Sequence, residues 1–205
     1  GVKLTHNKSN RYRRTQRELR YLQHCQAEIR KRQHIELANH LLALGDCFYV
    51  EDMAWPSLTH RAKETAISEK TGRIKRKKRF GKSVANKAPA TLIGILEQKC
   101  NSLGLPGVMK VPTSLRASQY NHQSGEYTSK PLSQRWNNMP DGERIQRDLY
   151  SAFLLQHYDP KTGNFDSALL QQDYPQFVQY HHRAIQRLST VPKTLSSMGI
   201  QRSLR

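Results

Sequence analysis

Two acidic residues of this chain stand where a carboxylate can hold a metal ion. Glu51 follows the apolar run at 47–50, which is predicted to be a short buried strand in a parallel pair. Ligands of α/β proteins bind at the carboxyl ends of such strands. Asp148 shares a face of a predicted helix with apolar residues, where a buried acid is costly unless it is paired or binds a metal. Because hard divalent cations select carboxylate oxygens, we expect Glu51 and Asp148 to face each other and to hold Mg²⁺ or Mn²⁺.

The chemistry that such a site supports is phosphodiester cleavage, in which two metal ions activate water and stabilise the leaving oxygen. A plainer interpretation makes Glu51 an exposed strand end and Asp148 an ordinary helical acid paired with Arg144 or Arg147. Carboxylates more than about 10 Å apart would favour a basic, RNA-associated structural protein, because the ions of a two-metal site lie only about 4 Å apart.

The chain carries an excess of positive charge that calls for an anionic partner. Its 205 residues include 34 Lys and Arg against 16 Asp and Glu, a formal net charge of +18. Neutralising phosphates releases counterions, so nucleic acid is the expected partner, with a basic soluble protein as the alternative. The sequence contains no apolar run of the roughly 20 residues that a membrane-spanning helix needs.

Positive charge is concentrated in two segments. Residues 9–44 are predicted to form one long helix with a basic face, and residues 54–87 a basic insertion. Either segment can be read as a merely solvated surface, but we predict that both contact phosphates. The side chains expected to make these contacts are Arg11, Arg13, Arg14, Arg17, Arg20, Lys75, Arg76, Lys77, Lys78 and Arg79.

The elements around these residues predict an α/β fold with few strands. Ser9 or Asn10 is expected to cap the long helix and Gly45 to end it, with Leu19, Leu22 and Ile29 in an apolar stripe that packs on a core. Helices are also predicted at 88–103, 144–158 and 165–188, and the last of them is expected to break near Pro175. The remaining predicted segments are a strand at 107–111, an irregular polar stretch at 113–142 and a loose tail beyond Ser189.

The order of these motifs resembles one family of nucleases. The run YVEDM at 49–53 resembles the second RuvC motif of the transposon-encoded TnpB nucleases (OrfB-type transposases) and of their type V CRISPR effector relatives. The run IQRDLYSA at 145–152 resembles their third RuvC motif, and the basic helix at 9–44 resembles the helix that precedes the second motif. The residues VPTS at 111–114 stand where that family enters a zinc ribbon.

The resemblance implies a partial RNase H-like (RuvC) fold over residues 1–158, followed by a helical C-terminal extension and tail at 159–205. It makes Glu51 and Asp148 metal-binding catalytic carboxylates of an RNA-guided DNA endonuclease, with DNA and a guide RNA as partners. Such a protein acts in the prokaryotic cytoplasm at the nucleoid, without a membrane or a small-molecule substrate.

Two departures from the family qualify this expectation. The family's first catalytic Asp lies upstream of the basic helix, so we expect the chain to be a fragment that is inactive alone. A catalytically inactive nucleic-acid-binding protein on the same fold is the alternative. Relatives also carry two Cys-x-x-Cys pairs for zinc, whereas this chain has no cysteine after Cys100, and His122 alone cannot complete a tetrahedral site. We therefore predict no zinc at 113–142, and direct packing around Tyr120, Tyr127 and Trp136 instead.

The remaining metal-ligating residue types receive structural roles. His181 and His182 are neighbours that point apart on a helix, so they are not expected to bind one metal ion. The odd, widely spaced set of Cys25, Cys47 and Cys100 argues against a disulfide framework and favours a reducing environment.

Overall fold

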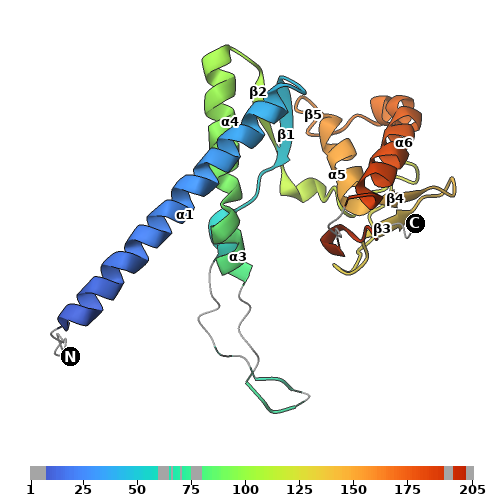
Figure 1. Ribbon diagram of the computed structural model, residues 1–205. Helices are drawn as coiled ribbons and strands as arrows, with labels where there is room; N and C mark the ends of the chain where they lie inside the picture. Colours follow the sequence, from blue (N-terminus) through green and yellow to red (C-terminus); the bar gives the residue numbers. More distant parts are fainter. Residues whose placement is uncertain are drawn as a thin grey trace. The chain divides into compact units, whose positions relative to one another are not determined.

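A computed structural model describes residues 8–59, 65, 67–69, 71–74, 80–191 and 196–201. The chain divides into two compact units, which Figure 1 shows together with the order of the elements. The first unit comprises Gly1–Cys47 and Ala54–Val108, and the second comprises Phe48–Met53 and Met109–Arg205. The fold is mixed α/β, since its helices are accompanied, in the described part, by three two-stranded sheets.

The first unit is built on helix α1, Asn10–Leu42. The hydroxyl of Ser9 caps it by accepting the backbone N–H of Tyr12 at 3.2 Å, and the N–H of Gly45 bonds back to the Leu41 carbonyl at 3.2 Å. These contacts confirm the predicted helix and its start. The expectation that its apolar stripe packs on a core is wrong for Leu19, Leu22 and Ile29, which are 52%, 60% and 56% exposed. The reason is that α4 lies against the C-terminal half of α1 only, as Figure 1 shows.

The described part of the first unit also contains three shorter helices. Helix α4, Pro89–Leu103, has Pro89 in its first turn and ends at Gly104, whose φ of 66° permits the left-handed cap; both features confirm the prediction. Helices α2, Trp55–Thr59, and α3, Phe80–Lys87, pack on each other. Gly81 lies so close to the backbone of Thr59 that no side chain fits there. The predicted basic contacts at 75–79 lie outside the described residues.

Strands β1, Cys47–Glu51, and β2, Gly107–Val111, form one of the small sheets. The N–H of Gly107 donates to the Asp46 carbonyl at 3.2 Å, and the N–H of Asp52 donates to the Val111 carbonyl at 2.8 Å. Because one bond joins the two starts and the other joins the two ends, the strands run parallel, as predicted. Strand β1 is half-buried along its length rather than fully buried.

The second unit packs helices α5, Arg147–Gln156, and α6, Ser167–Ser189, with two hairpins. The hairpins pair β3, Trp136–Asn138, with β4, Arg144–Gln146, and β5, Tyr158–Asp159, with β6, Asn164–Phe165, both antiparallel. The short helix η1 spans Thr113–Leu115. The core of the unit consists of Val111, Leu115, Ala117, Met139, Ile145, Tyr150, Phe153, Leu154, Phe165, Leu170 and Tyr174.

Three predictions for this unit are wrong, and each has a tertiary cause. Residues 144–146 form β4 instead of the first turn of a helix, because they pair with β3. Helix α6 continues through Pro175, because buried residues on either side, Tyr174 before it and His181 after it, hold the helix against the unit. The tail is not loose at 196–201, where helix η2, Ser196–Met198, leads to the buried Ile200.

Candidate functional site

Glu51 is the last residue of β1, in the second unit. Alternation along a strand puts it on the same face as Tyr49, which packs against the core of that unit. Its carboxylate is half-buried and has no hydrogen bond or ion pair with any other described residue. The neighbouring Asp52 is exposed on the other face. A partly desolvated carboxylate without a protein partner is suited to receive a cation.

Asp148 lies in the first turn of α5, where the helix dipole favours a negative charge. The expectation of a buried acid is wrong, because its side chain is 47% exposed. Helix α5 buries Tyr150, and residues two apart on a helix point to nearly opposite sides, so Asp148 faces away from the core. Gln146 Nε2 donates to Asp148 Oδ2 at 3.2 Å and orients the carboxylate.

Asp148 also has a cationic neighbour. Arg147 Nε lies 3.4 Å from Asp148 Oδ1, at the long end of hydrogen-bond geometry. This contact is the pairing that the plainer interpretation of Asp148 requires. Arg144, the other candidate partner, instead places its guanidinium over the ring of Trp136, 5.0 Å from the ring centroid.

The donor chemistry of Glu51 and Asp148 fits Mg²⁺, which uses one or two carboxylates and keeps several waters. Both residues belong to the same unit, one at a strand end and one at a helix start. Within the described ranges, no group of three or more His, Cys, Asp or Glu side chains is arranged to hold a metal ion. Any metal here would therefore depend on two carboxylates of this part of the chain together with substrate and water oxygens.

The region at 113–142 packs through aromatic side chains. The ring of Tyr120 lies 4.9 Å from that of Tyr127 and 5.4 Å from that of Phe165, which confirms the predicted packing at that point. His122 is buried, and its Nδ1 and backbone N–H both lie within 3.0 Å of the Tyr150 hydroxyl. Burial lowers the pKa of His122. His122 is thus part of the polar core.

His181 and His182 have separate roles. His181 is buried, and its Nε2 accepts the backbone N–H of Gln146 at 3.0 Å. His182 lies at the surface, where its Nε2 is 3.1 Å from Glu143 Oε2. Cys25, Cys47 and Cys100 are free thiols, and Cys100 is fully buried in the first unit.

The basic face of α1 is open to solvent in the first unit. Arg11, Arg13, Arg17 and Arg20 are exposed and form no ion pair with another described residue. Arg14 is also exposed but pairs with Glu18, its Nε lying 3.1 Å from Oε1. Four of the five predicted contacts on this helix are therefore available to a phosphate backbone.

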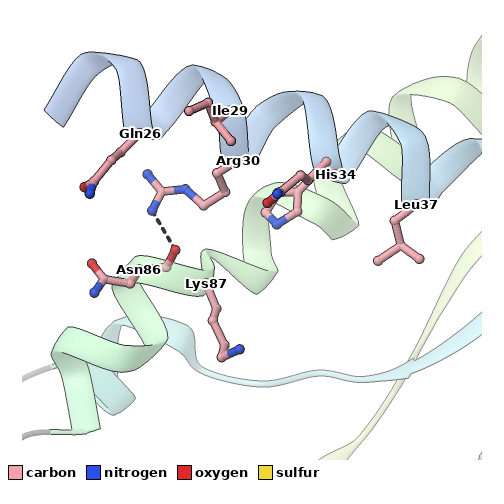
Figure 2. A pocket seen from close by; sticks show the side chains of 8 residues that line it. Gln26, Ile29, Arg30, His34, Leu37, Asn86 and Lys87 are labelled. Carbon is pink, nitrogen blue, oxygen red and sulfur yellow. Dashed lines mark hydrogen bonds between the residues drawn. The ribbon is translucent and has the colours of Figure 1, made fainter. Parts of the chain in front are cut away.

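A recess that the sequence does not reveal lies beside this helix in the same unit (Figure 2). It has a volume of about 570 Å³, between α1 and the end of α3. Arg30 Nη1 donates to the Asn86 carbonyl at 2.6 Å, and Lys87 also lines the recess. The Nδ1 atom of His34 is buried without a hydrogen-bond partner among the described residues. Cations and amides in one recess suit a phosphate or a base edge.

Comparison with known proteins gives no match. No protein-family model matches the chain, and neither a curated protein nor a solved structure shows significant similarity to it. None of the helices in the described ranges combines the length and apolarity needed to cross a membrane. The function is therefore inferred from the chain's own residues.

Proposed function

We propose that this chain is the C-terminal part of a TnpB-like DNA endonuclease, with an RNase H-like (RuvC) domain in which Glu51 and Asp148 bind Mg²⁺. The observation that carries the proposal is the Glu51 carboxylate, which is half-buried and lacks a partner among the described residues at the carboxyl end of a parallel strand. The motifs at 49–53 and 145–152 support it: Tyr49–Glu51 lie at the end of β1, and Arg147–Ala152 lie at the start of α5.

The two carboxylates receive different support from the chain. Glu51 is held by the pairing of β1 with β2 and presents its charge at the strand end. Asp148 is oriented by Gln146, whose Oε1 also caps α5 by accepting the N–H of Leu149 at 2.8 Å. When bound, Mg²⁺ supplies activation of water and stabilisation of the leaving oxygen of a phosphodiester. Exposure of Asp148 leaves that carboxylate accessible to a large substrate.

The nucleic-acid partners are proposed from charge. A net charge of +18 and the exposed arginines of α1 favour binding along a phosphate backbone. In the proposed protein a guide RNA reads the DNA sequence by base pairing, and the protein holds the heteroduplex through its shape and charge. The recess beside α1 adds Arg30, His34 and Lys87 to this basic surface.

The test is Mg²⁺-dependent DNA cleavage by the full-length protein loaded with its guide RNA. Glu51→Gln and Asp148→Asn are each expected to abolish cleavage while leaving DNA binding intact. Asp52→Asn is the matched control, since it removes an exposed charge next to Glu51 and should cleave normally. Undiminished cleavage by either of the first two variants would overturn the assignment.

A catalytically inactive nucleic-acid-binding protein on the same fold is the second candidate. The observation that favours it is the contact between Asp148 and Arg147, which already supplies Asp148 with a counter-charge. This candidate predicts guide-dependent DNA binding that is indifferent to Mg²⁺ and to both carboxylate substitutions. The same cleavage assay, run beside a binding assay, separates the two.

A further inference from the structure

The β3–β4 hairpin brings like charges together on one face. Its register pairs Asn137 with Ile145, and the N–H of Arg147 donates to the Arg135 carbonyl at 2.9 Å, so Arg135 lies opposite Arg147. Arg135 directly precedes β3 and Arg147 directly follows β4, so both cations lie at the same end of the hairpin, next to the strand that carries Asn137. Lys130 reaches the same place, since its Nζ donates to Asn137 Oδ1 at 2.9 Å. Like charges directly opposite each other on a hairpin are destabilising without a counter-charge.

The described residues provide little negative charge to compensate the cluster of Lys130, Arg135 and Arg147. The side chain of Arg147 is only 10% exposed, and its single described ion pair is the long one with the half-exposed Asp148. Lys130 and Arg135 form no ion pair with another described residue. Burial and the nearby charge of Arg147 both lower the pKa of Lys130, as expected for two cations held together. A buried cation that lacks full compensation is costly, so the cluster favours an anion.

A buried hydrogen-bond donor points to the same conclusion. Asn137 is 3% exposed, and its Nδ2 has no hydrogen-bond partner among the described residues, although its Oδ1 accepts from Lys130. Native proteins rarely leave such a buried donor unpaired without a bound group to receive it. An amide N–H₂ beside an ammonium and a guanidinium matches the acceptor oxygens of a phosphate.

We propose that Lys130, Asn137 and Arg147 form a binding site for a phosphodiester group of the nucleic-acid strand, next to Asp148. The inference rests on the proposed function in one respect, that this phosphate lies near the carboxylates proposed to bind metal. Because the contact between Arg147 and Asp148 is long, the guanidinium keeps N–H donors that would bind a phosphate beside Asp148. Lys130 and Arg147 are thus positioning residues for the strand.

The first experiment measures thermal unfolding of the chain in inorganic phosphate and in chloride at matched ionic strength. Phosphate should raise the unfolding midpoint above the chloride value, because a ligand that binds only the folded state stabilises it. Lys130→Met should remove this difference, whereas Lys161→Met, which removes an exposed lysine of the same unit, should keep it. Equal midpoints of the unsubstituted chain in the two salts would overturn the proposal.

The second experiment uses Asn137→Asp and a short single-stranded DNA oligonucleotide. The new carboxylate supplies the missing anion, so the free protein should unfold at the same or a higher temperature while DNA binding falls several-fold. Lys130→Met should reduce the slope of log K against log salt by about one. If Asn137 had a purely structural role, DNA binding by Asn137→Asp would fall only as far as its unfolding temperature falls. If Asn137→Asp binds DNA as tightly as the unsubstituted chain, the proposed site is wrong.

Glu51→Gln separates the phosphate site from the proposed metal site. Glu51→Gln should leave the phosphate-dependent stabilisation unchanged while abolishing cleavage by the full-length protein. If cleavage depends on Glu51 but phosphate gives no stabilisation, only the phosphate site is wrong. If phosphate stabilises the chain but Glu51→Gln still cleaves, only the metal assignment is wrong.

Discussion

The imidazole of His181 accepts the backbone N–H of Gln146 through Nε2, at 3.0 Å. This bond ties α6 to the residue at which β4 ends and α5 begins. Because Nε2 is the acceptor, the ring proton lies on Nδ1, which is buried without a partner among the described residues. Burial, with the neighbouring His182 as a smaller cause, lowers the pKa of His181 to about 4.

The lowered pKa of His181 predicts loss of stability in acid. An unfolded chain, with the ordinary histidine pKa of 6.5, binds more protons than the folded chain between pH 6.5 and about 4. Folding stability should therefore fall as the pH drops through this window, by about 3 kcal/mol in full, since one pKa unit corresponds to about 1.4 kcal/mol. Urea unfolding of the unsubstituted chain and of His181→Phe across this range measures the effect.

His181→Phe should be less stable than the unsubstituted chain near pH 7, because the Gln146 N–H loses its acceptor, but its stability should fall less steeply in acid. His182→Gln is the control, since that ring is 55% exposed, and it should keep the steep fall. Parallel pH profiles for His181→Phe and the unsubstituted chain would contradict the prediction.

Gly199 holds the C-terminal segment against β3. Its carbonyl accepts the Trp136 Nε1–H at 2.9 Å, its φ is 70°, and a Cβ there would lie 2.6 Å from the Cβ of Arg135. Gly199→Ala should therefore combine backbone strain with a clash and cost about 2 kcal/mol or more. Chemical unfolding followed by tryptophan fluorescence measures the loss, and limited proteolysis should show earlier cleavage of the tail.

Gly163 offers a matched comparison for Gly199. Its φ is 69°, but nothing lies within 4 Å of a Cβ built there. Gly163→Ala should show the strain alone, about 1 kcal/mol. Equal losses in the two variants would mean that the close approach of Gly199 to Arg135 does not contribute.

The buried hydroxyl of Tyr150 accepts a hydrogen bond from the backbone N–H of His122 and also hydrogen-bonds to the His122 Nδ1. Burial raises the pKa of this hydroxyl. Tyr150→Phe preserves the ring but leaves the His122 N–H and Nδ1 unpaired in the core. We expect a loss of about 2–3 kcal/mol in the free energy of unfolding, the usual penalty for orphaned buried polar groups. Tyr127→Phe, at an exposed position, should change stability by less than about 0.5 kcal/mol, and a similar small change in Tyr150→Phe would argue against the contact.

The arginines of α1 predict a salt-dependent contribution to nucleic-acid binding. Arg13→Gln and Arg17→Gln should each weaken binding similarly for all sequences and reduce the slope of log K against log salt by about one. Arg14→Gln should change the slope less, because Arg14 is already paired with Glu18. Filter binding at several salt concentrations distinguishes these outcomes, and identical slopes for all three variants would rule out a selective contribution of the unpaired arginines.

Features that depend on local sequence were predictable. Ser9 caps α1 and Gly104 ends α4 through contacts within a few residues, and the start of β1 was located from its apolar run. The exposure of Asp148 was not predictable in this way. It depends on where α5 begins, and that boundary is set by the pairing of β4 with β3 and by His181, which is 35 residues distant from Gln146.

The cluster of Lys130, Asn137 and Arg147 could not be predicted from the sequence for the same reason. No motif joins these residues, and they meet only through the register of a hairpin whose second strand was predicted to be helical. The recess beside α1 likewise combines Arg30 with Asn86, 56 residues apart. Contacts of this kind follow from tertiary pairing rather than from periodicity or capping.

The division of the chain also bears on its synthesis. The segment Phe48–Met53, which carries Glu51, belongs to the second unit, yet Ala54–Val108 separates it from the remainder of that unit. Folding of the second unit must close this long loop, which slows folding relative to contacts made between neighbours. Glu51 also leaves the ribosome well before Asp148, so the two carboxylates proposed to bind Mg²⁺ are both present only once translation has passed α5.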